Sequence, residues 1–293
     1  MEHDISLHSV YTNGAARYDD LIYLSIKDRD LEADDVEHAR FIGFQGGELG
    51  HMADTNWTSA AMCVVKRPSE KLIAISEDGE VFTYVKGTSQ AEKITPNPSV
   101  LRGLGVVDGQ AYACGMNRQS FRREDEGVWT PMHAAVADNS PKGGFEAITG
   151  FSAGEIYAVG WNGEIWKWDG SLWNNQPTPT NVILTRACAA DDELVYICGQ
   201  RGIIIRGRND QWELVAVDEL SEDLWDICCF DGDIYISSMT DVYKLVDGRI
   251  EPLEFGDDRP ETTYRLTHAQ GVLWSIGSDN VFSFDGSTWT RFD

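Results

Sequence analysis

The hydrophobic pattern of the chain is clearest between residues 155 and 173, where short apolar runs alternate with turns that contain Gly and Asp. Residues 156–159 form an apolar, β-rich run, and the next four residues, Gly-Trp-Asn-Gly, are typical of a tight turn. Polar and apolar residues then alternate to Trp168, Asp169-Gly170 predicts a second turn, and Trp173 lies in the strand that follows. This stretch therefore predicts two complete strands and the start of a third.

The same pattern returns along the whole chain. One central residue marks each copy: Tyr23, Ile73, Tyr112, Tyr157, Tyr196, Tyr235 and Trp274. Successive markers are 50, 39, 45, 39, 39 and 39 residues apart, and a further strand is expected roughly ten residues before each marker. A period near 40 residues with about four short strands per unit is typical of a β-propeller. Only residues 30–40 resemble a helix, and we expect there an inserted loop with one helical turn.

The predicted fold is all-β, a single seven-bladed β-propeller of four-stranded antiparallel blades. We expect one domain over 1–293, with blade 1 at about 5–56, an acidic insertion at 28–37, and blades 2–7 at about 57–293. The last blade looks complete, so the ring should close by packing blade 7 on blade 1, although residues 1–8 leave an added edge strand open. Links between blades are expected at 45–58, 87–99, 130–144, 174–183, 214–223 and 251–262. In each blade the strands are lettered A to D, and the B–C turns share one rim with these D–A links.

The repeat resembles the bacterial β-propellers whose units read I/V-Y-A-V-G-x-x-G-x-I-x-x-x-D-G-x-x-W, and more distantly the WD40, kelch and sialidase-type propellers. Trp168-Asp169 stands where a WD dipeptide would end a strand, but no unit carries the accompanying Gly-His. Residues 76–82 only approximate a sialidase Asp-box, and they lie on the wrong turn. The resemblance implies a fold rather than an activity, so no catalytic residues are carried over.

The charge of the chain indicates which partners it can bind. There are 48 Asp and Glu residues against 24 Lys and Arg, a net charge of −24. Such a field repels nucleic acid and anionic membrane and attracts cationic partners. The alternative is that the excess acid only keeps the protein soluble. The N-terminus shows no signal-peptide pattern, and no apolar run approaches the ~18 residues of a membrane span, so we expect a cytoplasmic protein.

The residues that usually carry chemistry are not arranged for it. The six cysteines lie in predicted strands without C-x-x-C spacing, and we expect buried, reduced thiols at Cys63, Cys114, Cys188, Cys198, Cys228 and Cys229. The histidines show no metal-ligand spacing, so no metal or cofactor is expected. Residues 150–154 match the G-x-S-x-G string, but they connect two strands rather than a strand and a helix, which makes a chance match the better interpretation.

Acidic residues concentrate in the B–C turns and D–A links of blades 6, 7, 1 and 2, which ring closure brings side by side. Tryptophans in equivalent connections add aromatic anchors of the kind that protein interfaces use. The predicted partner-binding residues on this rim are Asp30, Asp34, Asp35, Glu77, Asp78, Trp161, Arg201, Glu222, Asp223, Trp225, Asp241, Asp257, Asp258 and Asp279.

These observations favour a non-catalytic, cytoplasmic protein-binding propeller that docks a basic protein through an acidic rim. A specific version is an immunity protein that neutralises a cationic toxin such as a nuclease, because opposite charge speeds association. Two alternatives stay open: a hydrolase or lyase acting on a sugar or small molecule at the central channel, where paired carboxylates would serve, and an assembly scaffold. We expect neither nucleic acid nor membrane as a partner. The sequence leaves the oligomeric state open.

Overall fold

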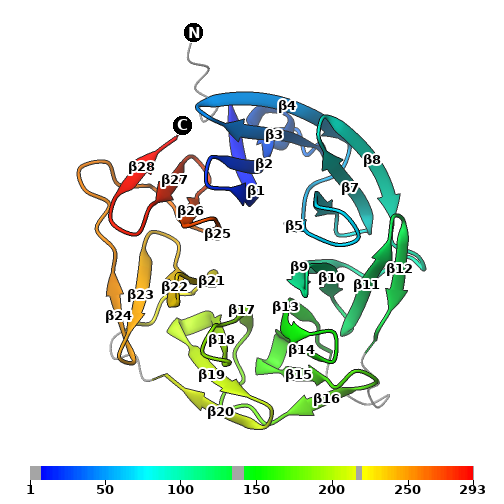
Figure 1. Ribbon diagram of the computed structural model, residues 1–293, viewed down its shortest axis with the longest axis vertical. Coiled ribbons are helices and arrows are strands. Elements are labelled where there is room, and N and C mark those ends of the chain that lie inside the picture. Colours follow the sequence, from blue (N-terminus) through cyan, green and yellow to red (C-terminus); the bar gives the residue numbers. More distant parts are fainter. Residues whose placement is uncertain (1–7, 134–141, 216–219, 293) are drawn as a thin grey trace.

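The computed structural model describes residues 8–133, 142–215 and 220–292, and the described strands form seven four-stranded antiparallel sheets around a ring (Figure 1). Blade 1 comprises β1 (Ser9–Tyr18), β2 (Leu21–Asp28), β3 (Ala39–Gln45) and β4 (Glu48–Thr55). Blade 2 comprises β5 (Ala61–Val65), β6 (Lys71–Ile75), β7 (Glu80–Val85) and β8 (Thr88–Lys93). Blade 3 comprises β9 (Leu101–Val107), β10 (Gln110–Gly115), β11 (Gln119–Asp125) and β12 (Val128–Pro131).

The second half of the ring repeats this order. Blade 4 comprises β13 (Phe145–Ser152), β14 (Glu155–Gly160), β15 (Ile165–Trp168) and β16 (Trp173–Gln176), and blade 5 comprises β17 (Leu184–Ala189), β18 (Val195–Gly199), β19 (Ile204–Arg208) and β20 (Gln211–Leu214). Blade 6 comprises β21 (Asp226–Phe230), β22 (Asp233–Ser237), β23 (Val242–Val246) and β24 (Arg249–Pro252), and blade 7 comprises β25 (Arg265–Ala269), β26 (Val272–Ile276), β27 (Val281–Phe284) and β28 (Trp289–Arg291). The described helices are α1 (Arg29–Ala33) and the 3-10 turns η2 (Trp161–Gly163) and η3 (Gln200–Gly202). None of them is long and apolar enough to span a membrane.

The predicted fold class is confirmed. In every sheet the strands follow sequence order, with the first strand at the centre of the ring and the fourth at its outside (Figure 1). All seven marker residues lie on the second strand of their blade, from Tyr23 on β2 to Trp274 on β26. The inserted segment of blade 1 contains the single helical turn expected there, because α1 has only five residues.

The predicted spans for the links are partly wrong. The spans 45–58 and 87–99 contain β4 and β8, the D strands of blades 1 and 2. The spans 130–144, 174–183, 214–223 and 251–262 each begin inside a D strand. The physical reason is that these D strands lie at the outer edge of their sheets, where neither face is fully covered. β8, with the sequence Thr-Ser-Gln-Ala-Glu-Lys, is almost wholly exposed and therefore has no apolar alternation to reveal it. Residues 134–141 and 216–219 of these spans lie outside the described residues.

Blade 7 packs directly on blade 1, as predicted, and each has four strands of its own. The backbone N–H of Tyr11 donates to the carbonyl of Ser278 at 2.9 Å, and that of Ala16 donates to Thr267 Oγ1 at 3.0 Å. One apolar cluster spans the junction and contains Ile22 from blade 1 and Trp274 from blade 7. An edge strand from residues 1–8 stays a prediction, because residues 1–7 lie outside the described residues.

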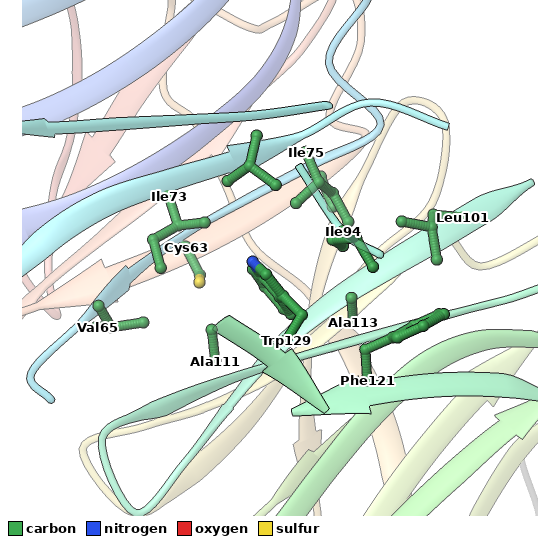
Figure 2. Packing of buried hydrophobic residues seen from close by; sticks show 12 residues of the cluster. Cys63, Val65, Ile73, Ile75, Ile94, Leu101, Ala111, Ala113, Phe121 and Trp129 are labelled. Atoms are coloured by element: carbon green, nitrogen blue, oxygen red, sulfur yellow. The ribbon is translucent and has the colours of Figure 1, made fainter. Parts of the chain in front are cut away.

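The core consists of apolar clusters between neighbouring blades. Figure 2 shows the cluster between blades 2 and 3, where Ile73 and Ile75 of β6 face Ala111 and Ala113 of β10, and Trp129 of β12 packs against them. A B strand has a blade on each side, so β6 is buried at all five positions. This double burial explains why the B strands are continuous apolar runs and why they identify the repeat.

Two B–C turns show why glycine recurs at the end of the repeat's first turn. In η2 and η3 the central residues, Asn162 and Arg201, have φ of 61° and 59°, and the glycines that follow them, Gly163 and Gly202, both have φ of 70°. A Cβ on Gly163 would lie 2.3 Å from the carbonyl oxygen of Thr180, in the link to the next blade. Only glycine fits such a close approach at positive φ. The D–A link therefore packs directly over the B–C turn.

All six cysteines are strand residues with free thiols. Cys63, Cys114, Cys198 and Cys228 are buried as predicted, whereas Cys188 and Cys229 are half-buried, so the expectation of full burial is wrong for those two. Both line the central channel, where the A strands lack a covering neighbour.

Candidate partner-binding rim

The B–C rim, defined as the face formed by the B–C turns and the D–A links, carries every residue predicted to bind a partner. The B–C connections hold Asp30, Asp34, Asp35, Glu77, Asp78, Trp161, Arg201, Asp241 and Asp279, and the links hold Glu222, Asp223, Trp225, Asp257 and Asp258. Around the ring, blades 6 and 7, together with the links that lead into them, are followed directly by blades 1 and 2 (Figure 1). The geometry thus brings these residues to one face.

The insertion of blade 1 is held in place by local contacts. Asp28 caps α1, because its side chain accepts hydrogen bonds from the backbone N–H groups of Asp30 at 2.9 Å and Leu31 at 3.3 Å. Arg29 forms an ion pair with Asp279 in the B–C turn of blade 7. This contact ties the insertion to the neighbouring blade, so the acidic insertion and the rim of blade 7 form a continuous surface.

Six of the predicted carboxylates already have partners within the protein. Four of them form ion pairs: Glu77 with Arg102 at 2.8 Å, Asp258 with Arg291 at 3.2 Å, Asp241 with Arg259, and Asp279 with Arg29. The other two accept hydrogen bonds, Glu222 from the Tyr243 hydroxyl at 2.5 Å and Asp223 from the backbone N–H of Arg201 at 2.9 Å. Desolvation and the bond to Glu222 raise the pKa of Tyr243. These carboxylates are partly committed to the fold, a difference that the sequence does not reveal.

The other five acidic residues are exposed and uncommitted. Within the described residues, no ion pair or side-chain hydrogen bond involves the carboxylates of Asp30, Asp34, Asp35, Asp78 or Asp257. Four of them lie in blades 1 and 2, and the fifth lies in the link that leads to blade 7. The carboxylates without partners within the described residues therefore occupy a narrower arc of the rim than all eleven predicted acidic residues together.

Apolar anchors lie on the same rim, in the connections of blades 4 to 6. Trp225 is 38% exposed and packs edge-on against Tyr264, with ring centroids 5.7 Å apart. Met239, in the B–C turn of blade 6, is 50% exposed. Trp161 is half-buried and donates from Nε1 to Glu146 Oε1 at 2.6 Å, so its ring is held in place against β13. Exposed Trp and Met side chains are typical of protein-docking surfaces.

The central channel opens onto this rim through a cavity of about 340 Å³. The A strands begin here, and they contribute Arg102, Glu146, Arg186 and Arg265, with Trp225 at the edge. A second cavity of about 260 Å³ lies deeper and is also lined by Arg186 and Arg265. The sequence pattern did not identify these side chains as site residues. All four lie at or within two residues of the start of an A strand. An alignment of the repeats would show this shared position, and it could have identified them as residues of the channel mouth.

The channel mouth combines opposite charges. Arg186 donates from Nη1 to the carbonyl of Glu146 at 3.1 Å, and its Nε lies 3.8 Å from Asp226 Oδ1. Asp226 also accepts from the backbone N–H groups of Leu266 at 3.1 Å and Ile227 at 2.9 Å. The side chain of Arg265 makes neither an ion pair nor a hydrogen bond with any other residue that the structure describes. Among those residues, no three His, Cys, Asp or Glu side chains are grouped to hold a metal ion.

No family model matches the sequence. The immune protein Tsi7 of Pseudomonas aeruginosa is 40% identical over 302 aligned positions, which cover 98% of this chain and 99% of Tsi7. Among solved structures, YCF48 bound to D1 peptide is similar with a TM-score of 0.51 and 17% identity, covering 65% of this chain and 67% of YCF48. The similarity to YCF48 supports the propeller fold alone.

Proposed function

The chain belongs to the family of the immune protein Tsi7, and from this we propose that it is an immunity protein that neutralises a toxin by binding it. The observation that carries the proposal is identity of 40% along nearly the whole of both chains, which leaves no large segment of this chain unmatched. A protein of this kind acts by occlusion and requires no catalytic residues of its own.

We further propose that the toxin is a basic protein, such as a nuclease, and that it is met in the cytoplasm. The net charge of −24 favours a cationic partner, and Asp30, Asp34 and Asp78 on the B–C rim are exposed and uncommitted within the described residues. Opposite charges across an interface raise the association rate and reduce binding to wrong partners. Trp225 and Met239 supply the apolar contacts that charge alone lacks.

The test compares two triple charge reversals. One changes Asp30, Asp34 and Asp78 on the B–C rim to Lys, and the other changes Asp19, Asp191 and Asp210, exposed residues of the opposite rim, to Lys. Both alter the net charge equally. At about 0.5 kcal/mol for each exposed charge, the B–C rim variant should bind the toxin about tenfold more weakly, mainly through slower association.

The assay measures association and dissociation rates with a catalytically inactive form of the full toxin, together with survival of cells that express the active form. Wild-type association should slow as salt is added, since exposed charges are screened over about 8 Å at physiological ionic strength. Equal binding by the two triple variants would show that the rim charge plays no part in docking. A chain that neither binds the toxin nor protects cells would refute the proposed function itself.

A further inference from the structure

We propose that the mouth of the central channel on the B–C rim is a pocket for a carboxylate side chain of the toxin, held by Arg265 with Arg186 beside it. The inference rests on the proposed function and extends it, because it assigns a specific chemistry to the centre of the interface. The occupant is an Asp or Glu that projects from an otherwise basic surface and enters the channel when the toxin docks.

The pocket has the size and the position that this requires. Its volume of about 340 Å³ is large enough for a carboxylate side chain together with bridging waters. It opens among the connections of the B–C rim, and Trp225 forms part of its lining. A protein that covers Trp225 would therefore also cover the pocket.

The side chains around the pocket leave one arginine without a hydrogen-bonded counterpart, although Asp226 and Glu146 lie near enough to act on its charge. Glu77 is paired with Arg102, and Glu146 accepts from the Trp161 indole. Asp226 accepts two backbone N–H groups and lies beside Arg186. Arg265 has five N–H donors in a planar fork, and no other described residue accepts from them. A carboxylate matches that fork with two parallel hydrogen bonds.

The environment of Arg265 disfavours its charge until an anion arrives. Burial and the nearby charge of Arg186 lower the pKa of Arg265 to about 10 and outweigh the opposite effect of Asp226 and Glu146, so the group is still protonated at neutral pH but only partly compensated. A carboxylate in the pocket would restore the compensation. Free anions are repelled by the net charge of −24, whereas a cationic protein that carries a carboxylate is attracted as a whole. This difference favours a side chain of the toxin over a small anion as the occupant.

The experiment compares Arg265→Gln with Arg40→Gln, which removes the same charge from an exposed residue on β3 near the insertion. Each variant makes the protein more acidic, so long-range attraction alone predicts equal or faster association with a basic toxin. We expect R265Q to bind the inactive full-length toxin at least tenfold more weakly, mainly through faster dissociation. R40Q should stay within twofold of wild type. Because Arg265 lacks a partner among the described residues, R265Q should melt at the wild-type temperature.

Changing the docking-face carboxylates of the toxin singly to amides provides the same test without altering this chain. One such change should weaken binding to wild type tenfold and leave binding to R265Q unaffected, and the absence of any such carboxylate would overturn the proposal. Binding by R265Q within twofold of wild type, with D30K/D34K/D78K still impaired, would refute the pocket and leave the proposed function standing. Acetate that binds to the free wild-type protein and not to R265Q would also overturn it, by identifying a small-anion site.

Discussion

The ion pair between Glu155 and Arg208 joins blade 4 to blade 5, and its removal should cost stability in a way that depends on pH. Arg208 donates from Nε and Nη2 to the two carboxylate oxygens of Glu155, each at 2.9 Å, and the Tyr157 hydroxyl donates to the same carboxylate at 2.9 Å. The guanidinium also lies over the ring of Phe151, with its carbon 4.4 Å from the ring centroid. We therefore predict that Glu155→Gln is destabilising at pH 7.

The magnitude follows from the pKa of Glu155, which these contacts lower from 4.5 to about 2, the bonds from Arg208 being the largest cause. At about 1.4 kcal/mol per pKa unit, the upper limit is roughly 3 kcal/mol. The Glu155 and Arg208 side chains are 19% and 28% exposed, so solvent screening reduces the expected loss to about 1.5–2 kcal/mol. Because the pKa is lowered in the folded state, the stabilisation is fully present above about 4.5 and is lost as the pH falls toward about 2.

Urea unfolding of wild type and E155Q at pH 7, 4 and 3 measures this difference, which should shrink by roughly half or more between pH 7 and pH 3. The control is Glu213→Gln in blade 5, where Glu213 lies 2.7 Å from Arg206 but both side chains are exposed, and a loss below about 0.5 kcal/mol is expected. A difference for E155Q that stays constant down to pH 3, or one no larger than that of E213Q, would refute the reasoning.

Two further predictions concern the interior. Glu92→Gln should lower the free energy of unfolding in urea by about 3–5 kcal/mol. The side chains of Arg123 and Glu92 are 1% and 5% exposed, and the substitution leaves a buried guanidinium uncompensated. A loss below about 1 kcal/mol would contradict this prediction. All six cysteines should be reduced, and the buried ones should react slowly with Ellman's reagent at pH 8 in the native protein, since burial raises the pKa of Cys63 and Cys198 to about 12. Unfolding should expose six thiols, and any smaller number would indicate a disulfide.

The repeat was predictable because its signal comes from burial on both faces. A B strand such as β18, buried at every position, must be apolar throughout, and the turns around it need glycine for steric reasons, as Gly202 shows by its 2.3 Å approach to the carbonyl oxygen of Leu220. Both constraints are visible in the sequence even where the other strands of the blade carry no clear pattern. The D strands β4 and β8 are largely exposed on both faces, so no constraint of this kind marks them.

The candidate site was predictable in its location but not in its composition. The rim followed from strand order alone, which places the B–C turns and D–A links on one face. Which carboxylates remain available depends on pairs that lie far apart in the chain, such as Arg29 with Asp279 and Arg291 with Asp258. No local pattern records these pairs, because each partner also fits an ordinary solvated turn.

Local sequence patterns likewise do not identify the arginines of the channel mouth. Arg186 and Arg265 lie at or near the starts of two A strands and are 79 residues apart in the chain, and only closure of the ring makes them line one cavity. A net charge of −24 describes the field that a partner meets at a distance, whereas these two cations determine what it meets at the centre of the rim. A partner selected by the field alone would carry only positive charge. Under the proposal of a carboxylate pocket, a partner that also fills the channel carries a carboxylate within that positive surface, and this second requirement would give the rim a means of distinguishing a basic toxin from other basic proteins.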